Sequence, residues 1–575
     1  MAILGIHDTH NAGAALVSNG MVVGAVNEER FTKLKNDVGF PAHSVRYLLK
    51  QLEGEEIEKV AVPWIGGSAL FARVFPALEI KRRRLWRRED PKPHKINMIL
   101  RNFVYKIVQN QNPKWIWKMA GRSIGSYQLG KKLDRLGVNK KIVFIDHHTS
   151  HAATAYYASG FKEALVITID GAGDGLSGSI SIGDNGELKR INEFKASASL
   201  GILYGAATIA CDLRFSEDEG KLMSLAAYSY PTRIKELNEI SYYDGDKRQL
   251  VSNIGSKFEF LLAEYMKDNF LWRYSREAFA SAVQKHAEEQ VIRIVRQYIK
   301  ETKIHNIAVS GGFFSNIITN MLINELPEVK DFFVFPQMGD GGLALGAAYY
   351  FDFQENGKLA NKQIDNVYYG PEYSNDEIEE VLKKYAKERR ISYDEVKDIA
   401  SYAAEKLANE NRIVLWFQGR MEYGPRALGN RSVLALANDP ENRNYLNLII
   451  KRRPYYQPFA STILEEDAAK ILDPYPRFNR FMTVGYNVKP EYRGRLVAAS
   501  HIDGTTRPQI LGRENRLYRD LLQKVREETG CGAILNTSFN KHGKPIVMDP
   551  EDAIWTLLNT GAKYLAIGDF FVEKK

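Results

Sequence analysis

The feature that most limits how this chain can fold is a pattern of strands and polar turns that occurs twice. Residues 3–6 form an apolar run, the polar stretch 7–13 follows, and an Asn-Gly turn at 19–20 lies between two further apolar runs. The same order returns at 164–169, where the apolar run leads into the glycine- and aspartate-rich stretch 170–175 and then into a second hairpin. Turns of this composition between apolar runs are typical of β-hairpins. The two copies lie much farther apart than solenoid repeats do, so the pattern predicts a duplicated subdomain.

Two such halves are typical of the actin-like, ribonuclease-H-like α/β fold, which binds nucleotides. In that fold the glycines and backbone amides of the turns can hold phosphates, and an aspartate can hold a metal. A later strand, 307–309, also ends in two glycines before a helix, an order that suits nucleotide contact but equally suits plain close packing. The candidate nucleotide contacts are Gly171, Gly173, Asp174, Gly311, Gly312 and Asn316.

A pair of histidines between the two copies suggests a metal site. His147 and His151 are four residues apart, so on a helix they share one face and can bind one ion. Asp170 follows closely, and Asp340 lies in a later Gly-Asp loop. Nitrogen ligands favour a transition metal over magnesium, and two histidines with two aspartates form an Fe(II)-type set. The alternative is a structural or solvated histidine pair, which is the commoner case when such a pair stands alone.

Residues 418–432 combine three arginines with three glycines directly after the apolar strand 413–417. The guanidinium fork fits phosphate or carboxylate, and glycine lets backbone N–H groups approach an anion closely. The stretch therefore predicts an oxyanion or phosphate pocket that includes Arg420, Arg426 and Arg431. The alternative is a solvated basic loop.

Three later loops of the C-terminal part place a cation or a hydroxyl group among small polar residues. Lys451, Arg507 and Ser538 come from separate loops and could converge on one phosphate. The alternative is that each loop only caps a helix or contacts solvent.

At 575 residues the chain is too long for one hydrophobic core, which favours two large domains. The polar stretch 353–375 indicates the joint between them, so we expect domains at 1–352 and 353–575. The sequence has only two cysteines, no long apolar run and no signal-peptide pattern. These features favour a reducing cytoplasm and argue against a disulfide framework, a zinc–thiolate site or a membrane span.

Positive charge is concentrated in residues 81–140, which hold 17 lysines and arginines against 3 aspartates and glutamates. The segment therefore carries a net charge of +14, whereas the rest of the chain sums to −5. Together with its tryptophans, this charge favours contact with a membrane surface, nucleic acid or an acidic partner. The equally weighted alternative is a helical insertion whose aliphatic stems cover a core face while the charges stay in water.

Taken in this order, the motifs resemble the O-carbamoyltransferase family, typified by the nodulation, cephamycin and tobramycin carbamoyltransferases. The resemblance runs from residue 3 to about residue 573. Besides the arginine-rich stretch it rests on residues 10–15, 147–151, 166–171, 219–226, 339–340 and 536–540. It implies an actin-like N-terminal domain similar to the TsaD-like transferase that places threonylcarbamoyl on tRNA, and a YrdC-like α/β C-terminal domain. Residues 60–140 are longer and more basic than the family's usual connection, and inserted segments near a transfer site often select substrates.

The resemblance also implies a two-step reaction. The C-terminal domain would form carbamoyl-adenylate from carbamoyl phosphate and ATP with Mg, releasing pyrophosphate. The N-terminal domain would then pass the carbamoyl group to a hydroxyl of a small natural product or a glycoconjugate. The family places Fe(II) or a similar divalent metal on His147, His151, Asp170 and Asp340. It places carbamoyl phosphate on Lys451, Arg507 and Ser538, a catalytic histidine at His10, and a nucleotide contact in the motif that contains Lys221.

Two other functions stay open at this point. A sugar-kinase-like phosphotransferase could use the same actin-like fold, but it would release ADP and would leave the arginine-rich C-terminal part unexplained. An RNA- or membrane-binding protein could act through residues 81–140, with a peripheral membrane contact favoured over nucleic acid. A homodimer is also compatible with the sequence.

Overall fold

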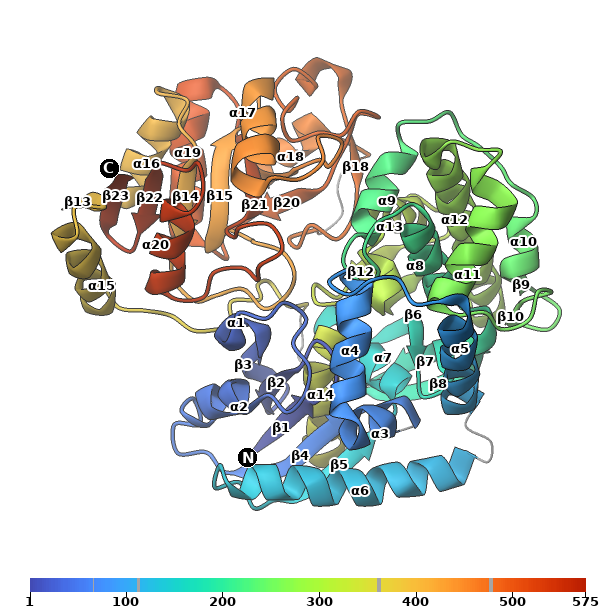
Figure 1. The fold of residues 1–575 in the computed structure, drawn as a ribbon. Helices are drawn as coiled ribbons and strands as arrows, with labels where there is room; N and C mark the ends of the chain where they lie inside the picture. The colour runs from blue at the N-terminus through green and yellow to red at the C-terminus, as the bar shows by residue number, and fades with distance from the viewer. Residues whose placement is uncertain (66, 111–113, 359–362, 475–478) are drawn as a thin grey trace. The chain divides into compact units, whose positions relative to one another are not determined.

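The computed structural model describes residues 1–65, 67–110, 114–358, 363–474 and 479–575, and these form two compact units (Figure 1). Unit 1 comprises residues 1–28 and 36–364, and unit 2 comprises residues 29–35 and 365–575. The expected boundary after residue 352 lies inside helix α14 (Leu343–Asn356). The chain leaves unit 1 later, because the N–H of Ile364 still donates to the carbonyl of Ala158 at 3.1 Å.

A short N-terminal segment belongs to unit 2, although it lies early in the sequence. It contains helix α1 (Glu29–Thr32), which follows the third strand of the chain. Arg30 donates to the carbonyl oxygen of Gly424 at 2.8 Å, and Lys33 pairs with Asp549 at 3.1 Å. Unit 2 is therefore built from two separate pieces of the chain.

Unit 1 contains two five-stranded sheets with the same topology. The first runs β3-β2-β1-β4-β5 and the second β8-β7-β6-β11-β12. In each sheet three consecutive strands form an antiparallel meander, and two later strands add in parallel beside its first strand. This equivalence is the duplication that the repeated strand–turn pattern predicts. The strands are β1 (Ala2–His7), β2 (Gly13–Ser18), β3 (Met21–Asn27), β4 (Ile57–Pro63), β5 (Lys141–Ile145), β6 (Glu163–Gly173), β7 (Leu176–Asp184), β8 (Glu187–Lys195), β11 (Asn306–Ser310) and β12 (Asp331–Val334).

Two helices pack between these sheets. Helix α14 packs on β1, β2 and β4 of the first sheet, helix α7 (His147–Ser159) packs on β6 and β11 of the second, and the two helices contact each other. The close approach depends on glycine. A Cβ at Gly346 of α14 would lie 2.0 Å from the carbonyl oxygen of Ser150 in α7, so no larger residue fits there. Both helices begin at one end of this interface, where the site described below is formed.

The insertion expected at residues 60–140 is largely helical. It contains α3 (Gly67–Val74), α4 (Pro76–Trp86), α5 (Lys95–Asn110) and α6 (Lys114–Asp134). Leu85 and Trp86 at the end of α4 are buried with Met98 of α5. Residues 111–113 of the basic segment lie outside the described residues, as do the side chains of Trp115 and Trp117. The other elements of unit 1 are α2 (Ala42–Leu49), α8 (Leu200–Ala210), α9 (Glu219–Ala226), α10 (Leu237–Ile240), β9 (Tyr242–Asp244), β10 (Gln249–Val251), α11 (Glu259–Met266), α12 (Arg276–Thr302) and α13 (Ile317–Asn324).

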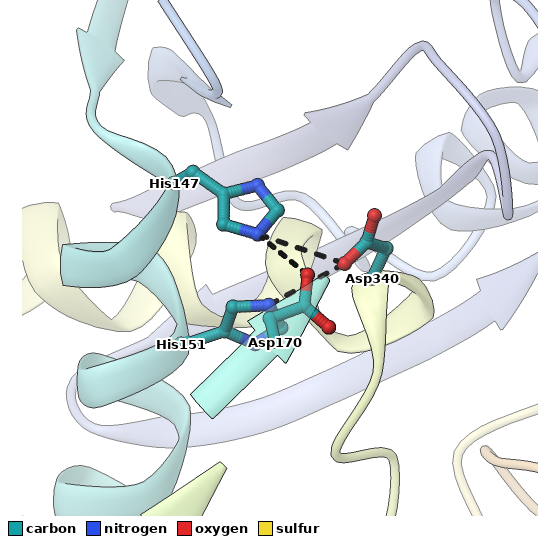
Figure 2. Close-up of side chains that lie close together, drawn as sticks. All are labelled: His147, His151, Asp170 and Asp340. Carbon is teal, nitrogen blue, oxygen red and sulfur yellow. Dashed lines mark hydrogen bonds and ion pairs between the residues drawn. The ribbon is translucent and has the colours of Figure 1, made fainter. Parts of the chain in front are cut away.

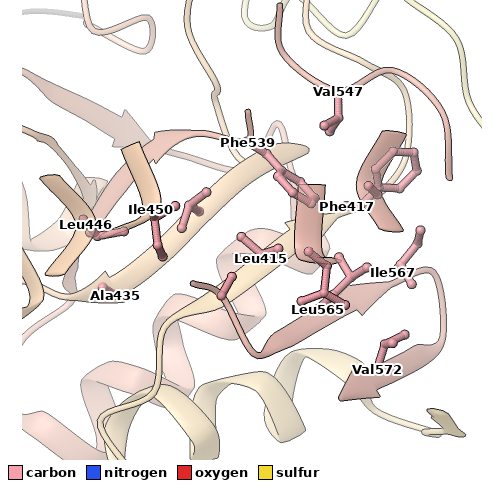
Figure 3. Close-up of a cluster of buried hydrophobic side chains, with 14 of the residues drawn as sticks. Leu415, Phe417, Ala435, Leu446, Ile450, Phe539, Val547, Leu565, Ile567 and Val572 are labelled. Carbon is pink, nitrogen blue, oxygen red and sulfur yellow. The ribbon is translucent and has the colours of Figure 1, made fainter. Parts of the chain in front are cut away.

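Unit 2 is built on a mixed eight-stranded sheet of order β13-β23-β22-β14-β15-β21-β16-β20. Side chains alternate across it, because successive residues of a strand point to opposite faces. Leu415 and Phe417 of β14 join one apolar core, shown in Figure 3, and Trp416 joins the core on the other face. The main strands are β13 (Ile391–Glu395), β14 (Val414–Phe417), β15 (Arg431–Leu436), β16 (Ala460–Leu464), β20 (Pro508–Leu511), β21 (Ala533–Ser538), β22 (Tyr564–Ile567) and β23 (Phe570–Lys574).

Helices cover both faces of this sheet, and a second, small sheet lies beside it. The small sheet has the order β17-β18-β19. Its strands are β17 (Leu472–Asp473), β18 (Tyr486–Val488) and β19 (Thr505–Thr506), and the helices are α15 (Asn375–Lys387), α16 (Ile399–Ala408), α17 (Pro440–Tyr445), α18 (Glu465–Ile471), α19 (Arg516–Thr529) and α20 (Pro550–Leu558). The chain is thus a mixed α/β protein with several sheets. Among the helices that the structure describes, none is long and apolar enough to cross a membrane.

Candidate metal centre and anion site

The histidine pair is positioned by the start of helix α7. Asp146 is the N-cap residue, and its carboxylate accepts the N–H of Thr149 at 3.1 Å, so the helix begins at His147. Four residues later His151 lies one turn on, on the same face. Both imidazoles are fully buried. The expected metal pair is therefore helical and faces the interior of unit 1.

The two histidines meet two aspartates from other elements (Figure 2). His147 Nε2 lies 3.3 Å from Asp170 Oδ2 and 3.7 Å from Asp340 Oδ1, and His151 Nε2 lies 3.4 Å from the same Asp340 oxygen. Asp170 belongs to β6, and Asp340 begins the single helical turn η4 (Asp340–Gly342) before α14. One atom from each residue lies within 4.8 Å of the other three. The structure therefore brings together all four residues that the sequence predicts as metal ligands.

The surroundings of these residues leave the correct atoms for a metal. His151 Nδ1 lies 3.3 Å from Ser310 Oγ, whose own hydrogen is donated to the carbonyl oxygen of Met338 at 3.1 Å. With Ser310 accepting from Nδ1–H, a lone pair is left on Nε2 of His151, a buried atom without a hydrogen-bond partner among the described residues. Asp170 uses Oδ1 to accept the N–H of Gly312 at 2.8 Å, so that Oδ2 points into the cluster. Two imidazole nitrogens and two carboxylate oxygens fit a divalent transition metal such as Fe(II).

The charges of the cluster also favour a cation. Burial opposes the charged form of His147, but Asp340 and Asp170 outweigh it and raise its pKa to about 9. Burial likewise raises the pKa of Asp340, but His10 and His147 outweigh it and hold that pKa well below its usual value. Two carboxylates this close therefore need positive charge between or beside them.

The predicted nucleotide glycines differ in what surrounds them. A Cβ at Gly173 would lie 2.2 Å from the ring of His147, and one at Gly312 would lie 2.7 Å from Asp170 Oδ1. Gly311 has φ +105° and lies against the carbonyl of Ile169, so its conformation also requires glycine. Gly171 has open space on its Cβ side. Gly173, Gly311 and Gly312 thus allow the close packing around the cluster, and nucleotide contact by all four glycines stays a prediction.

The side chains of the other predicted nucleotide contacts have partners within unit 1. Asp174 accepts the N–H of His147 at 2.9 Å and therefore helps to fix the start of α7. Lys221 pairs with Asp218 at 2.8 Å. Asn316 caps helix α13 and donates to Gln284 at 2.9 Å. Nucleotide contact by Asp174, Lys221 and Asn316 stays a prediction.

His10, the predicted catalytic histidine, lies beside the cluster. Its Nε2 is 3.0 Å from Asp340 Oδ2, and its ring packs edge-on against Trp64, which also packs against His147. Burial, followed by the positive charge of Arg83, lowers the pKa of His10 to about 3. The imidazole is therefore neutral near pH 7.

Helix α4 of the insertion brings two charged residues toward His10 that the sequence does not single out. Arg83 Nε donates to Glu79 Oε1 at 3.3 Å, and both side chains are buried. The other end of the guanidinium, Nη2, is buried without a hydrogen-bond partner among the described residues. The i, i+4 spacing of Glu79 and Arg83 was the available signal, but a run of six basic residues within residues 81–88 conceals which arginine turns inward.

In unit 2, a carboxylate shapes the arginine-rich stretch. Glu422 Oε1 accepts the N–H groups of Leu428 at 2.8 Å, Asn430 at 2.8 Å and Arg431 at 3.1 Å. The chain therefore folds back around one oxygen. This role of Glu422 is not visible in the sequence, where it stands as a single acid among arginines.

The three predicted arginines of this stretch have different roles. Arg431 is fully buried over the ring of Phe417 and donates to the carbonyl of Gln418 at 2.6 Å. Arg420 donates to the carbonyl of Tyr369 at 3.0 Å. These two guanidinium groups thus bind backbone. Within the described part of the chain Arg426 donates to no backbone carbonyl, and it lies near Arg453 and Arg507.

Four cations gather in unit 2. They are Arg426, Lys451, Arg453 and Arg507, and none forms an ion pair with a carboxylate among the described residues. Burial lowers the pKa of all four, and their mutual repulsion lowers it further for the last three. Arg507 Nε is buried without a hydrogen-bond partner in the described part of the chain. Such a cluster is stabilised by an anion.

Lys451 and Ser538, predicted from separate loops, are in contact. Lys451 ends the π-helical turn η5 (Leu446–Lys451). Its Nζ contacts the carbonyl of Ser538, lies 3.3 Å from Ser538 Oγ, and donates to Asn540 Oδ1 at 2.6 Å. Arg453 is an addition to the predicted set, and its Nε donates to Asn447 Oδ1 at 2.7 Å.

The chain matches two family descriptions. Residues 2–349 match the family described as Carbamoyltransferase N-terminus, and residues 404–574 match Carbamoyltransferase C-terminus. The Nodulation protein NolNO of Sinorhizobium fredii is 30% identical over 573 residues, which cover 98% of this chain and 79% of that protein. The 3'-hydroxymethylcephem-O-carbamoyltransferase of Amycolatopsis lactamdurans is 28% identical over 372 residues, 62% of this chain and 65% of that protein.

Among solved structures, full-length HypF in the phosphate- and nucleotide-bound form is similar with a TM-score of 0.34 and 12% identity. The match covers 63% of this chain and 56% of HypF. A likeness of this size supports no statement about function.

Proposed function

This chain belongs to the carbamoyltransferase family, and from that premise we propose that it makes carbamoyl-adenylate and then carbamoylates a hydroxyl group. Transfer of carbamoyl groups follows from the family itself. The adenylate, its two sites and the acceptor class are our proposals. The name of the Amycolatopsis relative describes a hydroxymethyl acceptor, which supports a hydroxyl of a natural product or glycoconjugate as the acceptor here.

Unit 2, as the proposed YrdC-like domain, would form the adenylate. Carbamoyl phosphate is a dianion with a poorly electrophilic carbonyl. The side chains of Lys451, Arg507 and Ser538 would bind its phosphate, and the half-buried cations Arg426 and Arg453 would add positive charge. Charge neutralisation would let two anionic substrates meet, which water alone disfavours.

The bond changes of this step are balanced with one water molecule. Water and carbamoyl phosphate give carbamate and inorganic phosphate. A carbamate oxygen then attacks the α-phosphorus of ATP, the bond to the β-phosphate oxygen breaks, and pyrophosphate leaves. The carbamoyl group is thereby joined to AMP. AMP is a better leaving group than the oxide or hydroxide that free carbamate would have to lose.

Unit 1, as the proposed actin-like transfer domain, would receive the adenylate. His147, His151, Asp170 and Asp340 would hold a divalent metal, which when bound supplies Lewis-acid polarisation of a phosphate or carbonyl oxygen. The acceptor oxygen forms its bond to the carbamoyl carbon, and AMP leaves with the electron pair. His10 lies beside the cluster, where it could take the hydroxyl proton or orient the adenylate. Its low pKa makes it a weak base, which supports the orienting role.

The observation that carries this proposal is the cluster of one buried and three half-buried cations in a chain of this family, which form no ion pair with a carboxylate among the described residues. The test is incubation of the protein with iron, ATP and carbamoyl phosphate, without an acceptor, followed by mass spectrometry. We expect carbamoyl-adenylate, AMP, pyrophosphate and phosphate. Formation of ADP with no AMP would instead support a sugar-kinase-like phosphotransferase.

A further inference from the structure

Helix α5 carries an apolar face that points away from the protein. Its members are Ile96, Ile99, Leu100, Phe103, Val104 and Ile107, each between 44% and 73% exposed. At about 100° per residue they fall within an arc of about 140° on one side of the helix. Single exposed apolar residues are ordinary on protein surfaces, but six on one helix face are not. We refer to these six residues as the α5 face.

The α5 face is not needed to hold the helix in place. Asn102 on the opposite side donates to the carbonyl of Ser256 at 3.3 Å and accepts the N–H of Phe258 at 2.9 Å. Tyr105 packs on the ring of Phe258 at 4.5 Å, and Met98 is buried. The helix is thus amphipathic in an unusual sense, because its inward side combines polar and apolar anchors while its outward side is apolar.

The charges around this face are positive. Helix α5 contains no acidic residue, and residues 81–140 carry a net charge of +14. Lys95 and Lys106 are exposed, and neither pairs with a carboxylate among the residues that the structure describes. On the helix both fall at the edge of the α5 face, where a long aliphatic stem can reach along a surface while the ammonium group meets an anion.

We propose that the α5 face docks on the surface of a bilayer that contains anionic lipid. The combination of a broad apolar arc with unpaired lysines at its edge is that of a helix lying in the membrane interface. The helix has 16 residues, a length of about 24 Å, and would lie flat rather than span. A second copy of this chain is a poorer occupant, because it would bring two segments of +14 together. The proposal does not depend on the proposed reaction.

The test is co-sedimentation of the full-length protein with phosphatidylcholine vesicles, with and without added phosphatidylglycerol. We expect binding to the anionic vesicles that weakens as salt rises, and little binding to the neutral ones. The double variant L100D/F103D should lose at least tenfold in partition, because two charges would enter the apolar interface. In the double variant K95Q/K106Q, each lysine removed should weaken binding to the anionic vesicles about fivefold.

A matched control places aspartate at two other exposed aromatic residues of unit 1, Tyr230 and Trp272, which are 91% and 73% exposed. The variant Y230D/W272D should bind like the wild-type protein. All variants should retain the wild-type Tm and circular dichroism spectrum, which shows that they fold. Absence of wild-type binding to anionic vesicles, or equal binding by L100D/F103D, would overturn the proposal. So would a wild-type dimer in sedimentation velocity that L100D/F103D dissociates, because the face would then join two copies.

Discussion

The two candidate sites balance charge in opposite ways. In unit 1, two carboxylates face two imidazoles, and one nitrogen or oxygen atom from each residue lies within 4.8 Å of the other three. In unit 2, four cations share a buried region with no carboxylate paired to them in the described part of the chain. The first arrangement is completed by a cation and the second by an anion. The comparison teaches that each site's ligand can be inferred from the charge its own residues leave uncompensated.

The largest expected effect is on the anion site. The variant Lys451→Ala removes a buried ammonium beside Ser538 and should lower pyrophosphate release about 1,000-fold, the scale of losing one aligned charge at a reacting phosphate. Pyrophosphate release with saturating ATP and carbamoyl phosphate measures it. Lys470→Ala, which removes an exposed lysine of the same unit, is the control and should be silent. Pyrophosphate release at the wild-type rate in Lys451→Ala would show that Lys451 does not bind the reacting phosphate.

The second prediction concerns how much a bound anion stabilises unit 2. Carbamoyl phosphate at 100 times its Kd should stabilise the protein by about 2.7 kcal/mol, which raises the Tm of a domain of this size by about 5 to 10 °C. Differential scanning calorimetry measures the shift. In Arg507→Gln, the shift should shrink to a degree or two, because a half-buried cation with no carboxylate partner among the described residues is removed. An equal shift in the variant would contradict the comparison.

The third prediction concerns the metal site. Ser310→Ala removes the acceptor that orients His151 Nδ1 and should weaken metal binding 10- to 100-fold, although Ser310 is not itself a ligand. Iron content after dialysis against a graded chelator measures the loss. Pyrophosphate release should not change. Ser315→Ala, a nearby exposed serine, provides the control, and unaltered iron retention in Ser310→Ala would show that the hydrogen bond does not matter.

The last prediction is a pH dependence of stability in unit 1, where charges are paired. Burial raises the pKa of Glu79, but Arg82 and Arg83 outweigh it and lower the pKa to about 2, against 4.5 in the unfolded chain. The stabilisation is therefore present above pH 4.5 and is lost as pH falls from 4.5 toward 2, an interval worth up to about 3 kcal/mol. Thermal unfolding should show the Tm gap between wild type and Glu79→Gln closing by several degrees over this range. A constant difference in Tm between the two proteins would mean that Glu79 and its arginine partners contribute no pH-dependent stability.

The duplicated sheets and the shared helical face of His147 and His151 could be predicted from the sequence because local rules decide them. Apolar runs and Asn-Gly turns define hairpins within a few residues, and the i, i+4 spacing of His147 and His151 places them on one helical face. Lys451 and Ser538 were likewise predictable, because each stands in a loop whose composition suits an anion. All of these signals are local and depend on spacing and residue type.

The remaining features depend on contacts between distant parts of the chain. Sequence alone treats the three arginines of residues 418–432 alike, whereas the structure turns Arg431 onto Phe417 and backbone carbonyls. Arg83 and Arg453 each lie in a run of basic residues, and only tertiary packing shows that Arg83 is buried and that Arg453 lies near Arg426 and Arg507. The inclusion of residues 29–35 in unit 2 is set by long-range contacts of Arg30 and Lys33, for which the sequence has no local signal.

The most direct test of the opposed charge balance is to measure both half-reactions in His151→Ala. This variant removes a proposed metal ligand of unit 1 and leaves the cations of unit 2 in place. We predict that iron is lost, that carbamoyl transfer to an acceptor stops, and that pyrophosphate release from ATP and carbamoyl phosphate continues at close to the wild-type rate. Full iron occupancy, or loss of pyrophosphate release together with transfer in a folded protein, would contradict the account.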